Sequence, residues 1–267
     1  MLKDITLGQY FPGKTVVHQL DPRTKLILVV VYIIALFSAK WFVTYGLMLA
    51  VLCCVIAASK IQVKTILRSM KPLLLIICLT GLLNLFYTDG ETLVSFWFLT
   101  ITKEGLRSAV FMILRIAMLI TGTFMLTYTT SPIALTDGLE LLLNPLKKIK
   151  VPVHELSMMM CIALRFIPTL IEETDKIMSA QKARGADFET GSLLQRAKAL
   201  IPILVPLFIS SFRRADELAV AMECRCYHGG DGRTRMKQLQ YQLKDYVSLC
   251  GGLVIMAAIF VLGYFGL

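Results

Sequence analysis

Three metal-binding side chains lie within five residues late in this 267-residue sequence, in Cys224-Arg-Cys226-Tyr-His228. Zinc binds thiolates and imidazoles, but a structural site usually takes four ligands from two separated pairs. His154 or Cys161 would have to complete the set. Because the cysteines also serve as small side chains beside an arginine, we expect no bound metal.

A second pattern of catalytic type begins at His154-Glu155, the start of the zinc-protease motif H-E-x-x-H. Met158 stands where the second histidine should be, which excludes that motif. Serine is also missing from any G-x-S-x-G context. The sequence contains no catalytic constellation, so we expect a chain that is not an enzyme and binds no cofactor itself.

Residues 8–15, Gly-Gln-Tyr-Phe-Pro-Gly-Lys-Thr, formally match the phosphate-binding pattern G-x-x-x-x-G-K-[ST]. That loop needs a buried strand before it and a helix after it, so that backbone N–H groups surround the phosphate. Residues 1–7 are too short and too polar for the strand, and residues 16–22 begin no convincing helix. We therefore interpret the match as accidental.

Two arginines 41 residues apart, Arg184 and Arg225, close long helical patterns. Each stands between two small residues, which are too short to shield its guanidinium. The helix macrodipole explains one cation at a helix C-terminus, but repetition at two successive helix ends favours presentation to a partner. The candidate docking residues are Ala183, Arg184, Gly185, Cys224, Arg225 and Cys226.

The composition indicates an all-α integral membrane protein. Hydrophobic residues make up 56% of the chain and charged residues 17%, with a mean hydropathy of +0.69, whereas globular domains are about 25% charged. Lys and Arg exceed Asp and Glu by 28 to 18. The basic residues between 60 and 71 and the acidic residues between 89 and 104 lie in alternate loops, so the surplus reports membrane topology and not nucleic-acid binding.

Five apolar segments predict membrane spans. Leu26–Ala58 is long enough for two short spans with a hairpin at Lys40, and Pro72–Tyr87, Leu106–Tyr128 and Tyr246–Phe265 give three more. Five spans with a cytosolic N-terminus place the C-terminus outside the cell.

Arg115 lies deep in the fourth predicted span, where a charge must face protein or water. The predicted spans contain no Asp or Glu that could pair with it. Its role stays open between function and structure. The lack of intramembrane acidic groups argues against a proton- or sodium-coupled carrier.

Residues 131–243 are richer in charge but keep helical periodicity. Ser131-Pro132 should begin one helix, and two longer ones should follow from Val153 and Leu193, each of some 35 residues and about 50 Å. Their polar faces suggest helices lying at the membrane surface, with a soluble bundle core as the alternative. Prolines predict bends or hinges at Pro168, Pro202 and Pro206.

These features together resemble the transmembrane T component of energy-coupling factor transporters, the CbiQ-like family. Leu20-Asp-Pro-Arg23-Thr-Lys25 resembles the family's L-D-P-R-x-K motif before the first span, and Ala183-Arg184-Gly185 matches the first of its two small-Arg-small motifs. Cys224-Arg225-Cys226 matches the second in part, since Ala and Gly flank that arginine in many members. The resemblance covers the whole chain.

The resemblance implies a coupling subunit of an ATP-driven bacterial importer of vitamins or micronutrients. Arg184 and Arg225 would each dock into one of two ABC-type ATPase subunits, which bind the ATP and magnesium. The apolar helix faces above them would hold an interchangeable substrate-binding membrane subunit, and nucleic acid is not an expected partner. The interface candidates are Met158, Ile167, Leu170, Ile171, Leu200, Leu204 and Phe208.

The expected organisation is a cytosolic lead-in (1–25), four spans (26–130), a coupling-helix module (131–243) and a last span (244–267). A stand-alone carrier or channel that binds substrate between its own helices is the rival hypothesis, and copurified ATPases would count against it. A membrane enzyme that uses the Cys224–His228 cluster is a third. The sequence names no cargo, because another polypeptide selects the cargo in this family.

Overall fold

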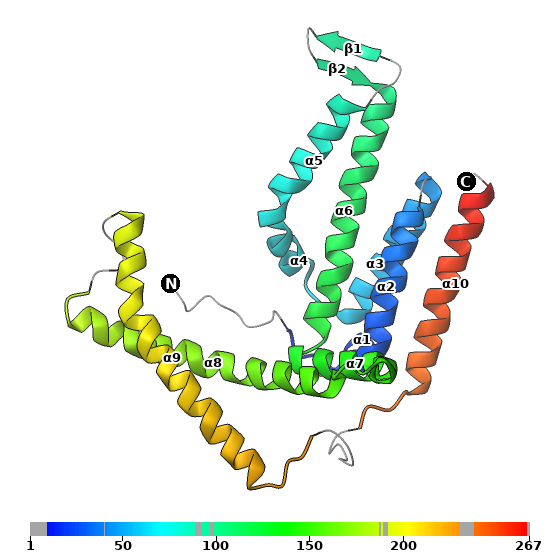
Figure 1. Cartoon of the computed structure of the whole chain (residues 1–267). Coiled ribbons are helices and arrows are strands. Elements are labelled where there is room, and N and C mark those ends of the chain that lie inside the picture. Colours follow the sequence, from blue (N-terminus) through cyan, green and yellow to red (C-terminus); the bar gives the residue numbers. More distant parts are fainter. Residues whose placement is uncertain are drawn as a thin grey trace. The chain divides into compact units, whose positions relative to one another are not determined.

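A computed structural model describes residues 10–39, 41–88, 92–96, 99–186, 188, 192–229 and 238–265 of the chain. They fall into two compact units, which we call the bundle unit (residues 8–139 and 239–267) and the strut unit (residues 140–238). Helices make up nearly all of the described structure (Figure 1), which confirms the predicted all-α membrane protein.

The bundle unit contains the helices that the apolar segments predict, with two additions. The predicted spans correspond to α2, α3, α5, α6 and α10, and Lys40 lies outside the described residues. The additions are a short amphipathic helix, α4, and a β-hairpin. In chain order the elements are α1 (Val16–Gln19), α2 (Pro22–Ser38), α3 (Phe42–Ser59), α4 (Val63–Met70), η2 (Lys71–Leu73), α5 (Leu74–Tyr87), β1 (Thr92–Phe96), β2 (Leu99–Thr102), α6 (Lys103–Thr129) and α10 (Leu243–Phe265).

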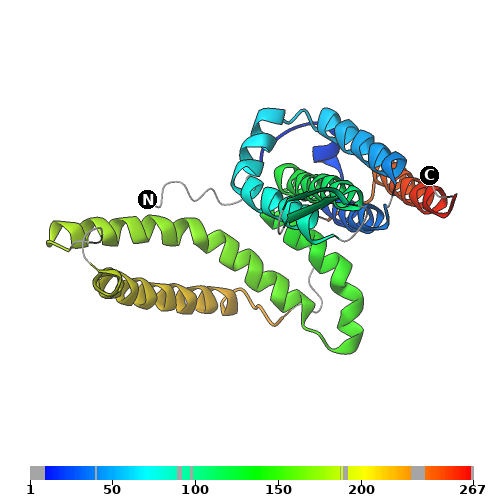
Figure 2. The same ribbon diagram turned by 90° about the horizontal axis from the view of Figure 1, so that it is seen from above.

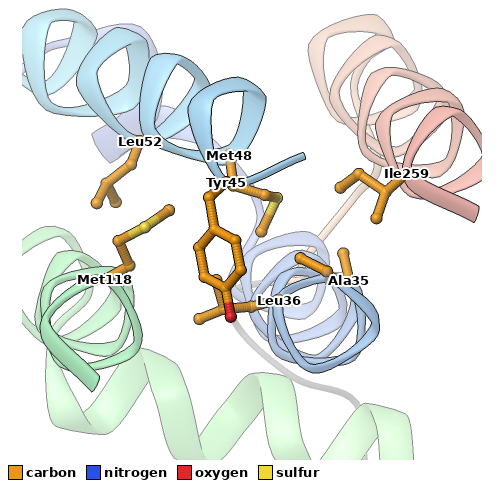
Figure 3. Packing of buried hydrophobic residues seen from close by; sticks show 8 residues of the cluster. Ala35, Leu36, Tyr45, Met48, Leu52, Met118 and Ile259 are labelled. Atoms are coloured by element: carbon orange, nitrogen blue, oxygen red, sulfur yellow. The ribbon is translucent and has the colours of Figure 1, made fainter. Parts of the chain in front are cut away.

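Side-by-side helices build the core of the bundle unit. α5 lies along α6, and α10 lies along α2 (Figures 1 and 2). Gly81 permits the first approach, because a Cβ there would come within 2.6 Å of Ile113 Cδ1. Figure 3 shows the main cluster, in which Met48 of α3, Leu36 of α2 and Ile259 of α10 are almost fully buried. Apolar burial of this kind stabilises the bundle.

Arg115 has neutral partners inside the bundle. Its Nε donates to the Tyr45 hydroxyl at 2.8 Å, and its Nη2 donates to the Ala39 carbonyl at 3.2 Å, beyond the end of α2. The guanidinium also lies 5.8 Å from the ring centroids of Phe37 and Tyr45. The arginine therefore joins α6 to α2 and α3, and none of its partners among the described residues is a carboxylate.

The L-D-P-R segment ties the start of α2 to the start of α10. Asp21 accepts from the backbone N–H of Arg23, which caps α2, and its own N–H donates to Asp245 Oδ1 at 2.8 Å. Arg23 Nη2 donates to Asp21 Oδ2 at 2.9 Å and to the Leu239 carbonyl at 3.0 Å, and its guanidinium lies 4.0 Å from the Tyr241 ring centroid. These bonds join the first chain segment of the bundle unit, at the start of α2, to its second segment, before and at the start of α10.

The lead-in before α2 is held by His18. Its Nδ1 lies 2.6 Å from Thr15 Oγ1, and its Nε2 lies 3.1 Å from the Phe11 carbonyl. Burial and the nearby Lys25 ammonium lower the pKa of this imidazole below its ordinary value. The neutral ring therefore fixes Thr15, and α1 is only a four-residue helix. Residues 8 and 9 of the phosphate-loop match lie outside the described residues.

The β-hairpin, like α4, is an element that the sequence did not predict. β1 pairs antiparallel with β2, with Phe96 opposite Leu99. The segment between the third and fourth predicted spans was expected to be only an acidic loop. Thr102 ends the hairpin and begins α6, because its Oγ1 accepts from the Gly105 N–H at 3.0 Å.

The strut unit consists of long helices. α7 (Pro132–Leu143) leads into it and begins as predicted, with Ser131 Oγ accepting from the Ala134 N–H at 3.3 Å. It contains η3 (Asn144–Ile149), α8 (Val153–Ala183) and α9 (Leu193–Glu223). α8 and α9 have 31 residues each, about 46 Å at the helical rise, so they are a little shorter than expected.

Five helical segments are long and apolar enough to cross a membrane: Phe42–Ser59, Val63–Tyr87, Lys103–Thr129, Val153–Ala183 and Leu243–Tyr264. The number agrees with the prediction, but the set differs. It includes α8, which we expect at the membrane surface, and omits the 17-residue α2. A helix of that length spans about 25 Å, slightly less than the hydrocarbon core. The surface position of α8 stays a prediction.

Candidate partner-docking site

α8 ends in a hydrogen-bond pattern that determines the residues around Arg184. The Gly185 N–H donates to the Lys182 carbonyl at 3.0 Å, and the Ala186 N–H donates to the Gln181 carbonyl at 3.0 Å. This pair of bonds is the Schellman motif, which needs a left-handed residue after the cap. Gly185 supplies it with φ +88°. Arg184 is the cap residue, and its side chain leaves from the last turn.

α9 ends in the same pattern. The Cys226 N–H donates to the Glu223 carbonyl at 2.8 Å, and the Tyr227 N–H donates to the Met222 carbonyl at 3.0 Å. Cys226 is the left-handed residue, with φ +56°. Arg225 therefore occupies the position that Arg184 occupies in α8. The shared motif of small residue, arginine and small residue reflects one backbone geometry used twice.

Both arginine side chains are exposed, as are Ala183, Gly185, Cys224 and Cys226. Within the described part of the chain, neither guanidinium has a hydrogen-bond or ion-pair partner. Five unused N–H donors in a planar fork suit a carboxylate or another planar acceptor. Each helix end can therefore form charge-assisted bonds with a second molecule.

Polar contacts join α8 to α9 between these ends. Glu173 accepts from Arg214 Nη2 at 2.9 Å and also from the Ser210 hydroxyl. Ile203 of α9 is buried, with 3% of its surface exposed. Glu173 is half-buried, so water solvates its carboxylate only in part. The charge-assisted hydrogen bond from Arg214 compensates for that loss.

The predicted hinge prolines lie inside continuous helices. Pro168 is within α8, and Pro202 and Pro206 are within α9, which changes direction along its length in Figure 1. Pro206 has no N–H for the carbonyl of Pro202, four residues earlier. The Gln181 side-chain amide of α8 donates to that carbonyl at 3.4 Å. A side chain of one strut thus replaces a lost helical bond of the other.

The candidate interface residues differ in exposure between the two helices. Leu200, Leu204 and Phe208 of α9 are 47%, 54% and 64% exposed. The four on α8, which are Met158, Ile167, Leu170 and Ile171, are half-buried.

Further exposed apolar residues extend these faces of α9 and α8 beyond the named interface candidates. On α9 they follow one another at spacings of three and four residues, as helical periodicity predicts. They are Ile201, Val205, Ile209 and Phe212, with Leu156, Met159 and Met160 exposed on α8.

Comparisons with known proteins show which family the chain belongs to. The profile of the cobalt transport protein family, CbiQ, matches residues 13–237. The chain is 55% identical over 262 residues to the energy-coupling factor transporter transmembrane protein EcfT of Clostridium kluyveri, covering 97% of each chain. It is 53% identical over 262 residues to the EcfT protein of Acidaminococcus fermentans, covering 98% of this chain and 96% of that one. The chain belongs to the T-component family of energy-coupling factor transporters. The EcfT protein of Lactococcus lactis is more distant, at 45% identity over 262 residues and 98% of each chain.

The cysteines of this T component do not form a metal centre with other described residues. Over the described ranges, no group of three or more His, Cys, Asp or Glu is placed to hold a metal ion. Cys224 and Cys226 are free thiols. His154 instead pairs through Nδ1 with Glu140 Oε1 at 3.0 Å.

Proposed function

We propose that this T component couples two ABC-type ATPase subunits to a separate substrate-binding membrane subunit. Arg184 and Arg225 would each dock into one ATPase. The observation that carries the proposal is the equivalence of the two helix ends, each with an exposed arginine in the same capping position. A repeated geometry of this kind suits two similar partner subunits.

Docking would rest on charge-assisted hydrogen bonds. A guanidinium that meets a carboxylate with two parallel bonds is fixed in orientation as well as position. Lysine would replace it poorly, because an ammonium group lacks the planar fork. Movement of an ATPase would then move the attached helix end, and the α8–α9 contacts at Glu173 and Pro202 would pass that movement along the struts.

The apolar face of α9 would hold the substrate-binding subunit. Leu200, Leu204 and Phe208 form an exposed stripe at helical spacing, and large exposed apolar faces usually mark an interface or a lipid surface. Met158 and its neighbours on α8 would extend the contact, since methionine side chains adapt to different partners. The half-buried Ile167, Leu170 and Ile171 would contribute at its edge. Pro168, Pro202 and Pro206 would act as hinges.

The chain itself would be non-catalytic. ATP and magnesium would bind to the ATPases, and the cargo would be a vitamin or micronutrient selected by the substrate-binding subunit. The protein would lie in the bacterial cell membrane with the N-terminus in the cytosol and the C-terminus outside. Its organisation would follow the lead-in, four-span, coupling-module and last-span scheme.

Charge reversal at the two arginines tests this proposal. Arg184→Glu or Arg225→Glu should each weaken ATPase binding by about tenfold or more, which is the worth of a charged hydrogen bond. The double variant should copurify without ATPases and show no substrate uptake. Arg213→Glu is the matched control, because Arg213 is also an exposed arginine of α9. Intact complex and uptake in the double variant would refute the docking role, and ion-coupled uptake by this chain alone would favour the carrier hypothesis.

A further inference from the structure

A cavity of about 460 Å³ lies within the bundle unit, with walls from α1, α2, α3, α6 and α10. Ala35, Met48 and Leu52 belong both to its wall and to the core cluster of Figure 3, so the core closes one end. Val16 of α1 and Ala58 of α3 line it as well, and both are exposed. Cys54, Val55 and Gly251 also line the cavity and are exposed, so it opens to the surroundings along several wall residues, Val16 and Ala58 among them.

The wall offers hydrocarbon and almost no free polar group. Lys25 is its one charged lining residue, and the Lys25 ammonium donates to the Thr129 carbonyl at 2.8 Å, the Thr130 hydroxyl at 3.1 Å and the His18 carbonyl at 3.2 Å. These three bonds use all three of its hydrogens.

The wall hydroxyls are also satisfied by the protein. Tyr32 donates to the Met118 carbonyl, Thr129 to the Met125 carbonyl and Ser248 to the Lys244 carbonyl. A cavity with such walls stays dry and favours an apolar ligand. Its volume falls in the range of pockets that bind small organic molecules.

Two lysines lie close in sequence to the open side of the cavity. Lys14 precedes Val16 by two residues, and Lys60 follows Ala58 by two residues. α1 and α3, which carry these wall residues, contact each other. Both lysines are exposed, and neither ammonium group has a partner among the residues that the structure describes. An apolar cavity with exposed lysines two residues along the chain from its wall matches a ligand with a hydrocarbon chain and an anionic head.

We propose that this cavity binds one acyl chain of an anionic phospholipid whose phosphate lies against Lys14 and Lys60. Three of its wall helices, α3, α6 and α10, are long and apolar enough to cross a membrane, so lipid chains would lie beside it. Basic residues beside a span attract anionic headgroups. Without a ligand, the side chains of α2, α3 and α10 that line the cavity lack packing partners on that side, and the bound acyl chain would supply them. This site is independent of the two arginine-ended helices.

Gly251 and Gly263 provide a matched pair of variants for testing chain binding. Both lie in α10, and a Cβ at either would meet nothing within 4 Å, but only Gly251 lines the cavity. Leucine is a better helix former than glycine, so both Gly251→Leu and Gly263→Leu should fold. Gly251→Leu adds bulk to a residue of the cavity wall, and Gly263→Leu adds the same bulk elsewhere on the helix.

The measurement is native mass spectrometry of the full-length chain, delipidated and titrated with phosphatidylglycerol. The unaltered chain and Gly263→Leu should each retain one lipid, and Gly251→Leu should bind at least tenfold more weakly. Equal binding by all three overturns the proposal, as does retention of a fatty acid or detergent in place of phospholipid. A phosphatidylglycerol with a photoreactive chain should also label peptides of α3 and α10 in the unaltered protein. Labelling confined to other helices contradicts the site even if Gly251→Leu misfolds.

Headgroup binding is tested with Lys14→Gln and Lys60→Gln. Each change should reduce the preference for phosphatidylglycerol over phosphatidylcholine about fivefold, the typical effect of one basic residue near an anionic membrane. Lys103→Gln is the control, because Lys103 is exposed at the opposite end of α6 from the cavity-lining Thr129. An unchanged preference in the double variant overturns the role of the two lysines.

Discussion

The ends of α8 and α9 share one hydrogen-bond geometry but differ in the residue that completes it. The left-handed position is Gly185 in the first and Cys226 in the second. Glycine adopts this conformation freely, whereas a side chain with a Cβ loses roughly 1–2 kcal/mol there. The comparison separates two requirements: the cap position places the arginine, and the residue after it determines how stable that placement is.

Cys226 is also a departure from the family pattern. Gly follows the second arginine in many members of the family that this sequence resembles, and a cysteine follows it here. Cys226 still adopts the left-handed conformation, so Arg225 keeps the same backbone position as Arg184. The end of α9 should therefore present its arginine correctly while opening more easily than the end of α8.

Gly185→Val is expected to cause the largest change in the stability of either helix end. A β-branched residue at φ +88° should destabilise the Schellman motif by about 2 kcal/mol. Hydrogen exchange at the Ala186 amide should accelerate at least tenfold, and ATPase binding should weaken. Ala183→Val is the matched control for the exchange rate, since Ala183 is helical and exposed. Equal exchange in the two variants would show that the left-handed residue does not hold this end.

A smaller effect is expected where the two helices meet. Glu173→Gln removes the charge that Arg214 contacts at 2.9 Å but keeps an acceptor for Ser210. Because both groups are partly exposed, the loss should be about 1 kcal/mol. Hydrogen exchange in α9 near Arg214 should rise several-fold, while ATPase affinity at both arginines falls slightly.

Glu172→Gln is the control for that change, because Glu172 is an exposed neighbour on the same helix. If both glutamines have the same effect, the contact between Glu173 and Arg214 does not join the helices.

The smallest expected effect is a gain in the stability of the end of α9, from Cys226→Gly. Cys226→Gly relieves the left-handed Cβ at φ +56° and should stabilise the end of α9 by about 0.5–1 kcal/mol. Exchange at the Tyr227 amide should slow about threefold, which makes the two ends alike. Cys224→Gly, which changes the neighbouring small residue, should instead destabilise by up to about 1 kcal/mol. A faster exchange in Cys226→Gly would mean that the cysteine side chain itself holds this end.

Sequence periodicity was sufficient to predict the long helices but not the short elements between them, α4 and the β-hairpin. α8 and α9 were predictable from apolar residues three and four positions apart, and α7 from its Ser131-Pro132 start. α4 was missed because only Ile66 is buried in it, so Lys64 and Arg68 suggested a basic loop. The hairpin was missed because its short strands lie beside turn-forming and acidic residues.

Contacts between distant residues could not be predicted from local patterns. The bond between Asp21 and Asp245 joins residues 224 positions apart, and no spacing rule connects them. Arg115 was expected to face protein or water, but the tyrosine hydroxyl and the carbonyl that accept its hydrogen bonds could not be predicted. The arginine pair was predictable as a motif. The shared Schellman geometry was not, because cysteine seldom adopts a left-handed conformation.

The affinity of the full-length chain for its ATPase subunits tests the central claim most directly. With the chain in lipid nanodiscs, the double variant Arg184→Glu/Arg225→Glu should raise the Kd at least a hundredfold, since two charged contacts are lost. Arg213→Glu should stay within about threefold of the unaltered chain, because the expected effect of a surface charge is below 1 kcal/mol. If the double variant also stays within that threefold range, these two helix ends are not the docking sites.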